Sequence, residues 1–251
     1  MMNRGDYSVE RCPTGIPGFD VLCNGGLVRN SINAVLGGPG AGKTIFCLQF
    51  LYNGVAKFRE NGLYISFEPD VIEIFKDAAI FGWDFQKLDS AGLCRVMRVS
   101  PLTDTQELKD ELTKAIAKFQ IRRICLDPVG LFRADVENSA KLRMMLFDLT
   151  SLLKRLNVTV LLADETAASD SEEIGMAASD AKEQYIKFLV DGIIDLYSSG
   201  LGGVGDRAVR IAKMRRTNHS RGPQPMQITN QGIQIISEQT GNDRRAKKGL
   251  F

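Results

Sequence analysis

The sequence is poor in several features that mark particular classes of protein. It holds 1 histidine and 1 tryptophan among 251 residues, and its 32 basic residues nearly balance its 30 acidic ones. This small net charge gives no reason to expect nucleic acid or an acidic membrane surface as an obligatory partner. The length suits one α/β domain with a sizeable core.

The sequence also has no long apolar run, and its first residues show no signal-peptide pattern. No run approaches the ~18 apolar residues of a membrane-spanning helix, and the start, Met1 to Asp6, has no signal-peptide core. The cysteines are odd in number and mostly inside apolar runs, which favours small core residues over a disulfide frame or a zinc site: Cys12, Cys23, Cys47, Cys94 and Cys125. We therefore expect a cytoplasmic protein with no membrane association.

The most informative stretch, residues 37–44, reads GGPGAGKT and fits the phosphate-binding pattern GxxxxGK[ST]. Apolar residues from Ile32 to Leu36 predict a buried strand before it, and Ile45 to Lys57 predicts a helix after it. Glycines let successive backbone amides converge on an anion, and the helix start adds its own unpaired amides. The pattern predicts nucleotide contacts from Gly38, Pro39, Gly40, Ala41, Gly42, Lys43, Thr44 and Ile45, with Lys43 on the β- and γ-phosphates and Thr44 on Mg²⁺.

Two carboxylates close predicted strands. The strand Leu63–Phe67 ends on Glu68, and the strand Ile124–Leu126 ends on Asp127. Because the carboxyl ends of parallel strands face the ligand crevice of an open α/β sheet, both are site candidates. Asp127 could cap the next turn, but downstream of a phosphate loop we favour a role as the second Mg²⁺ partner beside Thr44.

The order of the remaining elements predicts the fold class. Beyond the turn-rich first thirty residues, periodicity predicts helices at Asp70–Phe81, Asp104–Phe119 and Ser139–Leu156 and strands at Leu93–Val99, Val158–Ala163 and Gly192–Leu196. Short strands follow at Ala208–Met214, Met226–Ile228 and Ile233–Ile236. This pattern indicates an α/β fold with a mainly parallel central sheet flanked by helices and antiparallel strands at the C-terminal end. We expect one domain over residues 1–237 and a basic, flexible tail over 238–251.

With these motifs in place, the chain resembles the KaiC family of RecA-like P-loop ATPases from about Thr14 to Ile235. The resemblance rests on TGIPGFD at 14–20, NGG at 24–26, the phosphate loop, FGWD at 81–84 and KMRRTNH at 213–219. One such domain is present, whereas some members of the family carry two in tandem.

The resemblance implies a homo-oligomeric ring, typically a hexamer, with ATP at each subunit boundary. Lys213, Arg215 and His219 would act in trans on the γ-phosphate held by a neighbour's loop, with Met214, Thr217, Thr229 and Asn230 lining the nucleotide edge. Without the resemblance, alternating Lys and Arg would be interpreted as a solvated hairpin face. An arginine finger in trans accelerates phosphoryl transfer by roughly 1,000- to 100,000-fold.

The chain departs from the family pattern where hydrolysis is catalysed. The family usually has a Glu-Glu pair, and here it is Glu68-Pro69. Glu68 would orient and deprotonate the attacking water, while Pro69 removes the second carboxylate and an amide donor. Ile80 replaces a serine near the base, and Pro128 replaces a serine after Asp127. We expect slow, Mg²⁺-dependent hydrolysis that requires Glu68.

The favoured hypothesis is a nucleotide-driven switch: a ring-forming ATPase whose slow hydrolysis changes its shape or its partners. Two alternatives stay open beside it. One is a recombinase-like module that binds single-stranded DNA, disfavoured by the acidic loop after Thr166 and supported by Arg133 and the basic tail. The other is a nucleotide-locked scaffold that does not hydrolyse ATP, which Pro69 favours. Self-phosphorylation has no clear acceptor motif, and neither the protein partner nor the choice between ATP and GTP is encoded in these motifs.

Overall fold

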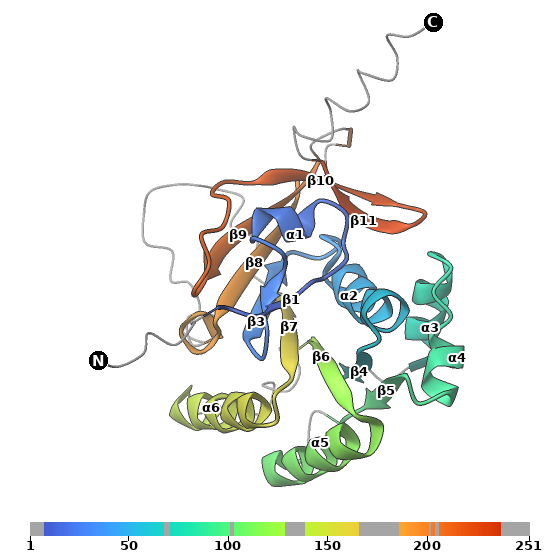
Figure 1. The fold of residues 1–251 in the computed structure, drawn as a ribbon, viewed down its shortest axis with the longest axis vertical. Coiled ribbons are helices and arrows are strands. Elements are labelled where there is room, and N and C mark those ends of the chain that lie inside the picture. The colour runs from blue at the N-terminus through green and yellow to red at the C-terminus, as the bar shows by residue number, and fades with distance from the viewer. Residues whose placement is uncertain are drawn as a thin grey trace, which may run out of the picture.

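A twisted sheet forms the centre of the molecule. The computed structural model describes residues 8–67, 71–100, 103–128, 139–165, 186–200, 202–203 and 206–236. Within these ranges, nine strands form one sheet in the order β11-β10-β9-β8-β3-β7-β6-β4-β5 (Figure 1). The strands from β3 to β8 run parallel, and β9, β10 and β11 continue the sheet as antiparallel neighbours.

The strands of this sheet alternate with helices along the chain, as parallel pairing requires. The parallel strands are β3 (Ile32–Gly37), β4 (Asn61–Ser66), β5 (Cys94–Arg98), β6 (Ile121–Asp127), β7 (Thr159–Glu165) and β8 (Gly192–Ser198). The antiparallel strands are β9 (Arg207–Met214), β10 (Gln224–Thr229) and β11 (Gly232–Ile235).

Helices cover both faces of the sheet (Figure 1). One face carries α2 (Lys43–Phe58), α3 (Val71–Ala79) and α4 (Phe85–Ser90), and the other carries α5 (Thr105–Phe119) and α6 (Ser139–Arg155). Asp104 caps α5 by accepting from the amides of Gln106 and Glu107, and Asp84 caps α4 by accepting from Lys87 N.

Strand β3 shows how the two faces share one core. Val35 packs with the layer of α2, whereas Ile32, Ala34 and Leu36 pack with α5 and α6. Because successive side chains of a strand point to opposite faces, a strand covered on both sides is apolar at nearly every position. This burial fixes the register of the strand that leads into the phosphate loop.

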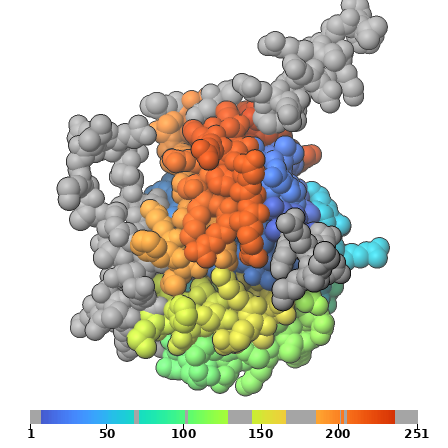
Figure 2. All heavy atoms as spheres, turned by 60° about the vertical axis from the view of Figure 1, so that its left-hand side comes forward, coloured from blue at the N-terminus to red at the C-terminus, as the bar shows by residue number. Residues whose placement is uncertain are grey.

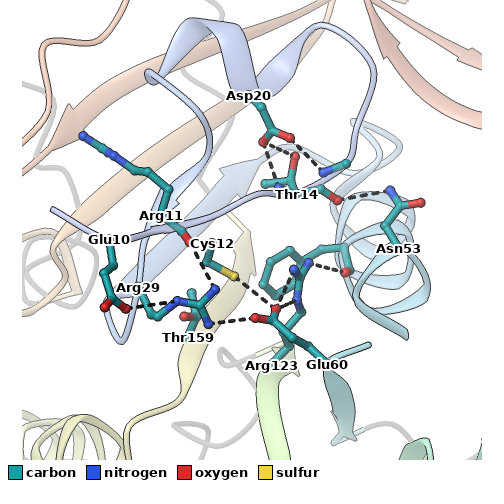
Figure 3. Close-up of polar contacts among 12 residues, drawn as sticks. Glu10, Arg11, Cys12, Thr14, Asp20, Arg29, Asn53, Glu60, Arg123 and Thr159 are labelled. Carbon is teal, nitrogen blue, oxygen red and sulfur yellow. Dashed lines mark hydrogen bonds and ion pairs between the residues drawn. The ribbon is translucent and has the colours of Figure 1, made fainter. Parts of the chain in front are cut away.

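The N-terminal segment forms a small layer beside α2. Its strands β1 (Arg11–Cys12) and β2 (Leu27–Val28) pair with each other, and the short helix α1 (Phe19–Leu22) lies between them. Figure 3 shows Asp20 accepting from the hydroxyl of Thr14 at 2.7 Å, while Asn53 of α2 donates to the Thr14 carbonyl at 3.1 Å. The polar side chains of this layer therefore fasten it to α2.

The predicted fold class is confirmed, and most predicted elements are present. The sequence analysis missed α4, β1 and β2, because each is short and the two strands exist only through their pairing with each other. The five cysteines are buried and free, as expected of core residues. No helix within the described ranges is long and apolar enough to cross a membrane.

The proposed tail, 238–251, lies outside the described residues, so the division into domain and tail stays a prediction. Trp83 is buried at 4% exposure and stacks on Tyr52 and Phe81, so this tryptophan is a packing residue. Figure 2 shows the C-terminal strands, in orange and red, on the surface above the yellow and green helical layer.

Candidate active site

The phosphate loop connects the carboxyl end of β3 to the start of α2. A side chain at Gly37 would place its Cβ 2.5 Å from the carbonyl oxygen of Leu196 in β8, so the loop can leave the sheet here only without one. Gly42, the residue before α2, has a φ of 99°, in the left-handed region that favours glycine. These two positions let the chain turn tightly and begin the helix with its amides directed at the loop.

Lys43 lies folded over this loop. It is 9% exposed, and its Nζ donates to the carbonyl oxygens of Gly37 and Gly38, both at 2.9 Å. Its ammonium also lies 3.9 Å from Oε1 of Glu165, the last residue of β7. The charge of Lys43 is therefore held at the loop, where a phosphate group could replace these weaker acceptors.

Glu165 was not assigned a role from the sequence, although the polar end of its strand was visible. Its position follows from strand pairing, because Glu165 lies opposite Gly37 in the parallel register of β3 and β7. A carboxylate at the end of an adjacent strand is the signal that could have suggested this contact. The side chain is 64% exposed, so the ion pair with Lys43 adds little stability.

Asp127 ends β6 at the same edge of the sheet. Its carboxylate is buried, and Oδ2 accepts a 2.7 Å hydrogen bond from the hydroxyl of Tyr64. Burial of Tyr64 and the charge of Asp127 raise the pKa of this hydroxyl well above its ordinary value, so it stays a donor. Tyr64 was missed, although a tyrosine in an otherwise apolar buried strand usually needs a hydrogen-bond partner.

The residues suited to hold a divalent cation are Thr44 and Asp127. Among the residues that the structure describes, the Thr44 hydroxyl has no hydrogen-bond partner, and Asp127 Oδ1 has none either. Those residues contain no cluster of three or more His, Cys, Asp and Glu side chains that could hold a metal unaided. The oxygen donors fit Mg²⁺ that keeps several waters and binds phosphate as well.

Glu68 and Pro69, where catalysis of hydrolysis was predicted, lie outside the described residues. The last described residue before them is Phe67, whose amide donates to the Asp127 carbonyl at 3.4 Å. The described part of the chain before Glu68 therefore ends beside Asp127. The role of Glu68 stays a prediction, as does that of the acidic loop after Thr166 and of Arg133, which also lie outside these ranges.

The predicted trans-acting segment lies at the opposite edge of the sheet from this loop. Met214 pairs with Gly192, and Gly192 pairs with Asn33, near the start of β3. Since strands rise about 3.3 Å per residue, the level of Met214 lies about 13 Å along the sheet from Gly37. The structure therefore does not bring this segment to the phosphate loop of the same chain.

Within that segment the side chains differ in exposure. Arg215 is 58% exposed, whereas His219 is half-buried, with its Nδ1 3.0 Å from the Ser220 carbonyl oxygen. The Thr217 hydroxyl accepts from Arg11 at 2.7 Å, and Lys213 Nζ donates to the carbonyls of Lys187 and Val190. Met214 is 6% exposed and belongs to the core, and its place at the nucleotide edge stays a prediction.

Thr229 and Asn230 occupy a different place, the turn between β10 and β11. A side chain at Gly42 would meet Ile228 at 3.1 Å, so this hairpin lies over the start of α2. Thr229 accepts from the amide of Gln231 and donates to the Gly232 carbonyl, while Asn230 is exposed. These two residues are thus on the side of the chain's own loop, apart from Lys213 and Arg215.

Comparison with known proteins identifies the family. The family model for the KaiC ATPase matches residues 12–240. The circadian clock oscillator protein KaiC of Parathermosynechococcus lividus is 33% identical over 247 residues, covering 93% of this chain and 44% of that protein. The protein of the same name from Nostoc sp. (strain PCC 7120) is 34% identical over 243 residues, covering 93% of this chain and 46% of its own length.

A solved structure agrees with this relationship. The crystal structure of a KaiC-like protein from the hyperthermophilic archaeon Pyrococcus horikoshii OT3 superposes with a TM-score of 0.78 at 27% identity. The match covers 92% of this chain and 100% of that one. The chain spans about half the length of the curated relatives that it matches. With a RecA-like fold, a phosphate loop and a match over nearly its whole length, the chain belongs to the KaiC family of ATPases.

Proposed function

We propose that this chain is a Mg²⁺-dependent ATPase whose catalytic sites form between neighbouring copies in a homo-oligomeric ring. In this proposal the ring is a hexamer or a similar closed assembly in the cytoplasm. Slow hydrolysis would change the shape of the ring or its choice of protein partner. Membership of an ATPase family supports nucleotide binding, and the arrangement of charged side chains supports the shared site.

Each ring contact would join two halves of a site. One chain contributes Lys43 and the loop amides for the phosphates, Thr44 and Asp127 to hold Mg²⁺, and Glu68 to deprotonate the attacking water. Its neighbour contributes Lys213, Arg215 and His219 at the γ-phosphate. When bound, Mg²⁺ neutralises phosphate charge, and the positive side chains stabilise the charge that develops in phosphoryl transfer.

The observation that carries this proposal is the separation of the two halves. Lys213 and Arg215 lie at the amino edge of β8, whereas the phosphate loop follows the carboxyl end of β3. A side chain spans far less than the about 13 Å between these levels together with the two strand spacings across the sheet. If these residues act on ATP, they act on ATP held by another chain.

Complementation between variants tests the shared site. Lys43→Ala removes the phosphate-binding half, and Arg215→Ala removes the trans-acting half, so each alone should lose about 1,000-fold in hydrolysis. When the two variants are mixed, some subunit interfaces combine an intact loop with an intact Arg215. With random pairing at equal amounts, phosphate release should return to about a quarter of the wild-type rate. Two inactive variants that stay inactive when mixed, in rings shown by native mass spectrometry to contain both, would refute the shared site.

The alternatives make different predictions in the same assay. A nucleotide-locked scaffold would bind ATP and release no phosphate in any mixture. A module for single-stranded DNA would show hydrolysis stimulated strongly by added oligonucleotide and weakened by salt. We expect no such stimulation, because the loop after Thr166 is rich in acidic residues.

A further inference from the structure

Asp191 lies directly before β8, which begins at Gly192. It is 6% exposed. Its backbone amide donates to the Ile32 carbonyl at 2.7 Å, and its carbonyl accepts from Arg215 N at 2.9 Å. The backbone of one residue thus joins the start of β3, the strand that leads to the phosphate loop, to the segment that carries Arg215.

The Asp191 carboxylate repeats this connection through its side chain. Oδ2 accepts from the Ile32 amide at 3.1 Å, and Lys154 of α6 lies 2.8 Å from the same oxygen. Oδ1 lies 3.9 Å from Nη1 of Arg215. Lys154 Nζ also donates to Oδ1 at 3.0 Å, so the sheet and α6 together fix the carboxylate, and its Oδ1 faces the guanidinium of Arg215 as well.

The residues just before Asp191 hold the second cation of the segment. Lys213 Nζ donates to the carbonyls of Val190 at 2.8 Å and Lys187 at 2.9 Å. Residues 187–191 therefore contact both cationic side chains that the proposed function assigns to the neighbour's γ-phosphate. No pattern in the sequence indicates this arrangement, because Asp191 only precedes the predicted strand Gly192–Leu196 and its partners Ile32, Lys154 and Arg215 are distant in the chain.

We propose that Asp191 is a positioning residue that holds Arg215 ready for the nucleotide of the neighbouring subunit. This inference rests on the proposed function, because it requires Arg215 to act in trans. An exposed arginine left alone samples many rotamers, and ordering it costs conformational free energy when the reaction needs it. A fixed carboxylate restricts that freedom beforehand, which lowers the cost of reaching the reactive arrangement.

The geometry suits a restraint that can be released. At 3.9 Å the contact between Asp191 and Arg215 is at the long limit of an ion pair, and Arg215 remains 58% exposed. A phosphate group carries more charge than one carboxylate and offers several acceptor oxygens, so it can take over the guanidinium. Lys154 remains beside Asp191 and keeps its charge paired after this exchange.

A purely structural role for Asp191 is the competing explanation, because the pair with Lys154 joins α6 to the sheet. The two roles predict different effects for two substitutions. Asp191→Asn removes the charge facing Arg215 but keeps an oxygen that can accept from the Ile32 amide. Lys154→Met removes the ion pair with α6 but leaves the Asp191 carboxylate facing Arg215.

The test measures steady-state phosphate release by rings of each full-length variant. For Asp191→Asn we expect kcat to fall about 10- to 100-fold and the KM for ATP to stay within about twofold, because the phosphate loop of the same chain is intact. Lys154→Met and the control Asp195→Asn, four residues further along in β8, should keep kcat within about threefold. Equal losses in Lys154→Met and Asp191→Asn would assign Asp191 a structural role and overturn the inference.

Mixing separates this inference from the proposed function. Asp191→Asn lacks a positioned Arg215 but has an intact loop, so adding Lys43→Ala subunits should restore hydrolysis as Arg215→Ala with Lys43→Ala does. If the pair containing Arg215→Ala recovers and the pair containing Asp191→Asn does not, the shared site stands and the positioning role is wrong. If neither pair recovers, the shared site itself is wrong and the inference falls with it.

Discussion

Glu60, which follows α2, pairs with two arginines, Arg29 and the buried Arg123. Arg123 is fully buried, and both its Nε and its Nη2 lie 2.7 Å from Oε2 of Glu60. The other carboxylate oxygen lies 2.7 Å from Arg29, as Figure 3 shows. Arg123 also lies over the rings of Phe50 and Phe58, and Gly54 leaves the room that its side chain needs. One carboxylate thus neutralises a cation that has no access to water.

Glu60→Gln should destabilise the protein strongly. Breaking a buried pair by removing one partner costs about 3–5 kcal/mol, because it leaves Arg123 charged and unpaired. We expect this loss in the free energy of unfolding measured with urea at pH 7. Glu73→Gln, which breaks an exposed pair with Lys76, is the control and should cost below about 1 kcal/mol. A similar small loss in Glu60→Gln would contradict the assigned role.

The ionisation of Glu60 should also make the difference in the free energy of unfolding between wild type and Glu60→Gln depend on pH. Although burial alone would raise the pKa of Glu60, the hydrogen bond from Arg29 and the charge of Arg123 lower it below the ordinary value. A lowered pKa stabilises the folded state above the ordinary pKa, and this contribution is lost as the pH falls through the folded value. The difference in the free energy of unfolding between wild type and Glu60→Gln should therefore become smaller below a pH of about 4.5. A gap that is constant with pH would show that the charge of Glu60 is not what stabilises the fold.

At the scale of elements, the hairpin of β10 and β11 depends on one side chain of α2. Gln49 is 3% exposed, its Nε2 donates to the Ile233 carbonyl at 3.1 Å, and its Oε1 accepts from the Ile233 amide at 2.7 Å. The pair of hydrogen bonds mimics a strand partner for β11 at the edge of the sheet. It places the hairpin over the start of α2, where the phosphate loop ends.

Gln49→Leu should loosen this hairpin. The substitution leaves a buried amide and a buried carbonyl of Ile233 without partners, at a cost of about 1–3 kcal/mol each. Amide hydrogen exchange across residues 232–235 should speed up about tenfold or more, with little change in α5. Gln106→Leu, on the exposed face of α5, is the matched control. Unchanged exchange at Ile233 would contradict the role of Gln49.

Elements that depend on neighbours in the sequence could be predicted, whereas contacts between residues distant in the chain could not. Local signals predicted β3, the phosphate loop and α2, because strand burial, glycine turns and helix periodicity lie within a few residues of one another. The predicted strand began at Ile124, whereas β6 begins at Ile121 and buries Arg123 completely. The partners of Arg123 lie in α2 and after it, so no local pattern indicates its burial.

At the scale of the whole molecule, part of the candidate site could be predicted from the sequence and part could not. The positions of Lys43, Thr44 and Asp127 at one edge of the sheet could be predicted, because parallel strands end at a common edge. The separation of Lys213 and Arg215 from that edge depends on β9 pairing antiparallel to β8, and the contacts of Asp191 depend on three segments distant in the chain. In the proposed function, each complete site therefore needs more than one copy of the chain.

The most direct test of that central claim is phosphate release from Mg-ATP across a wide range of protein concentration, with the mass of the assembly measured at each point. We expect the specific activity to rise as rings form, because isolated chains lack the Lys213 and Arg215 of a neighbour. Full specific activity at concentrations where the protein is monomeric would contradict the account, since it would mean that one chain holds a complete site.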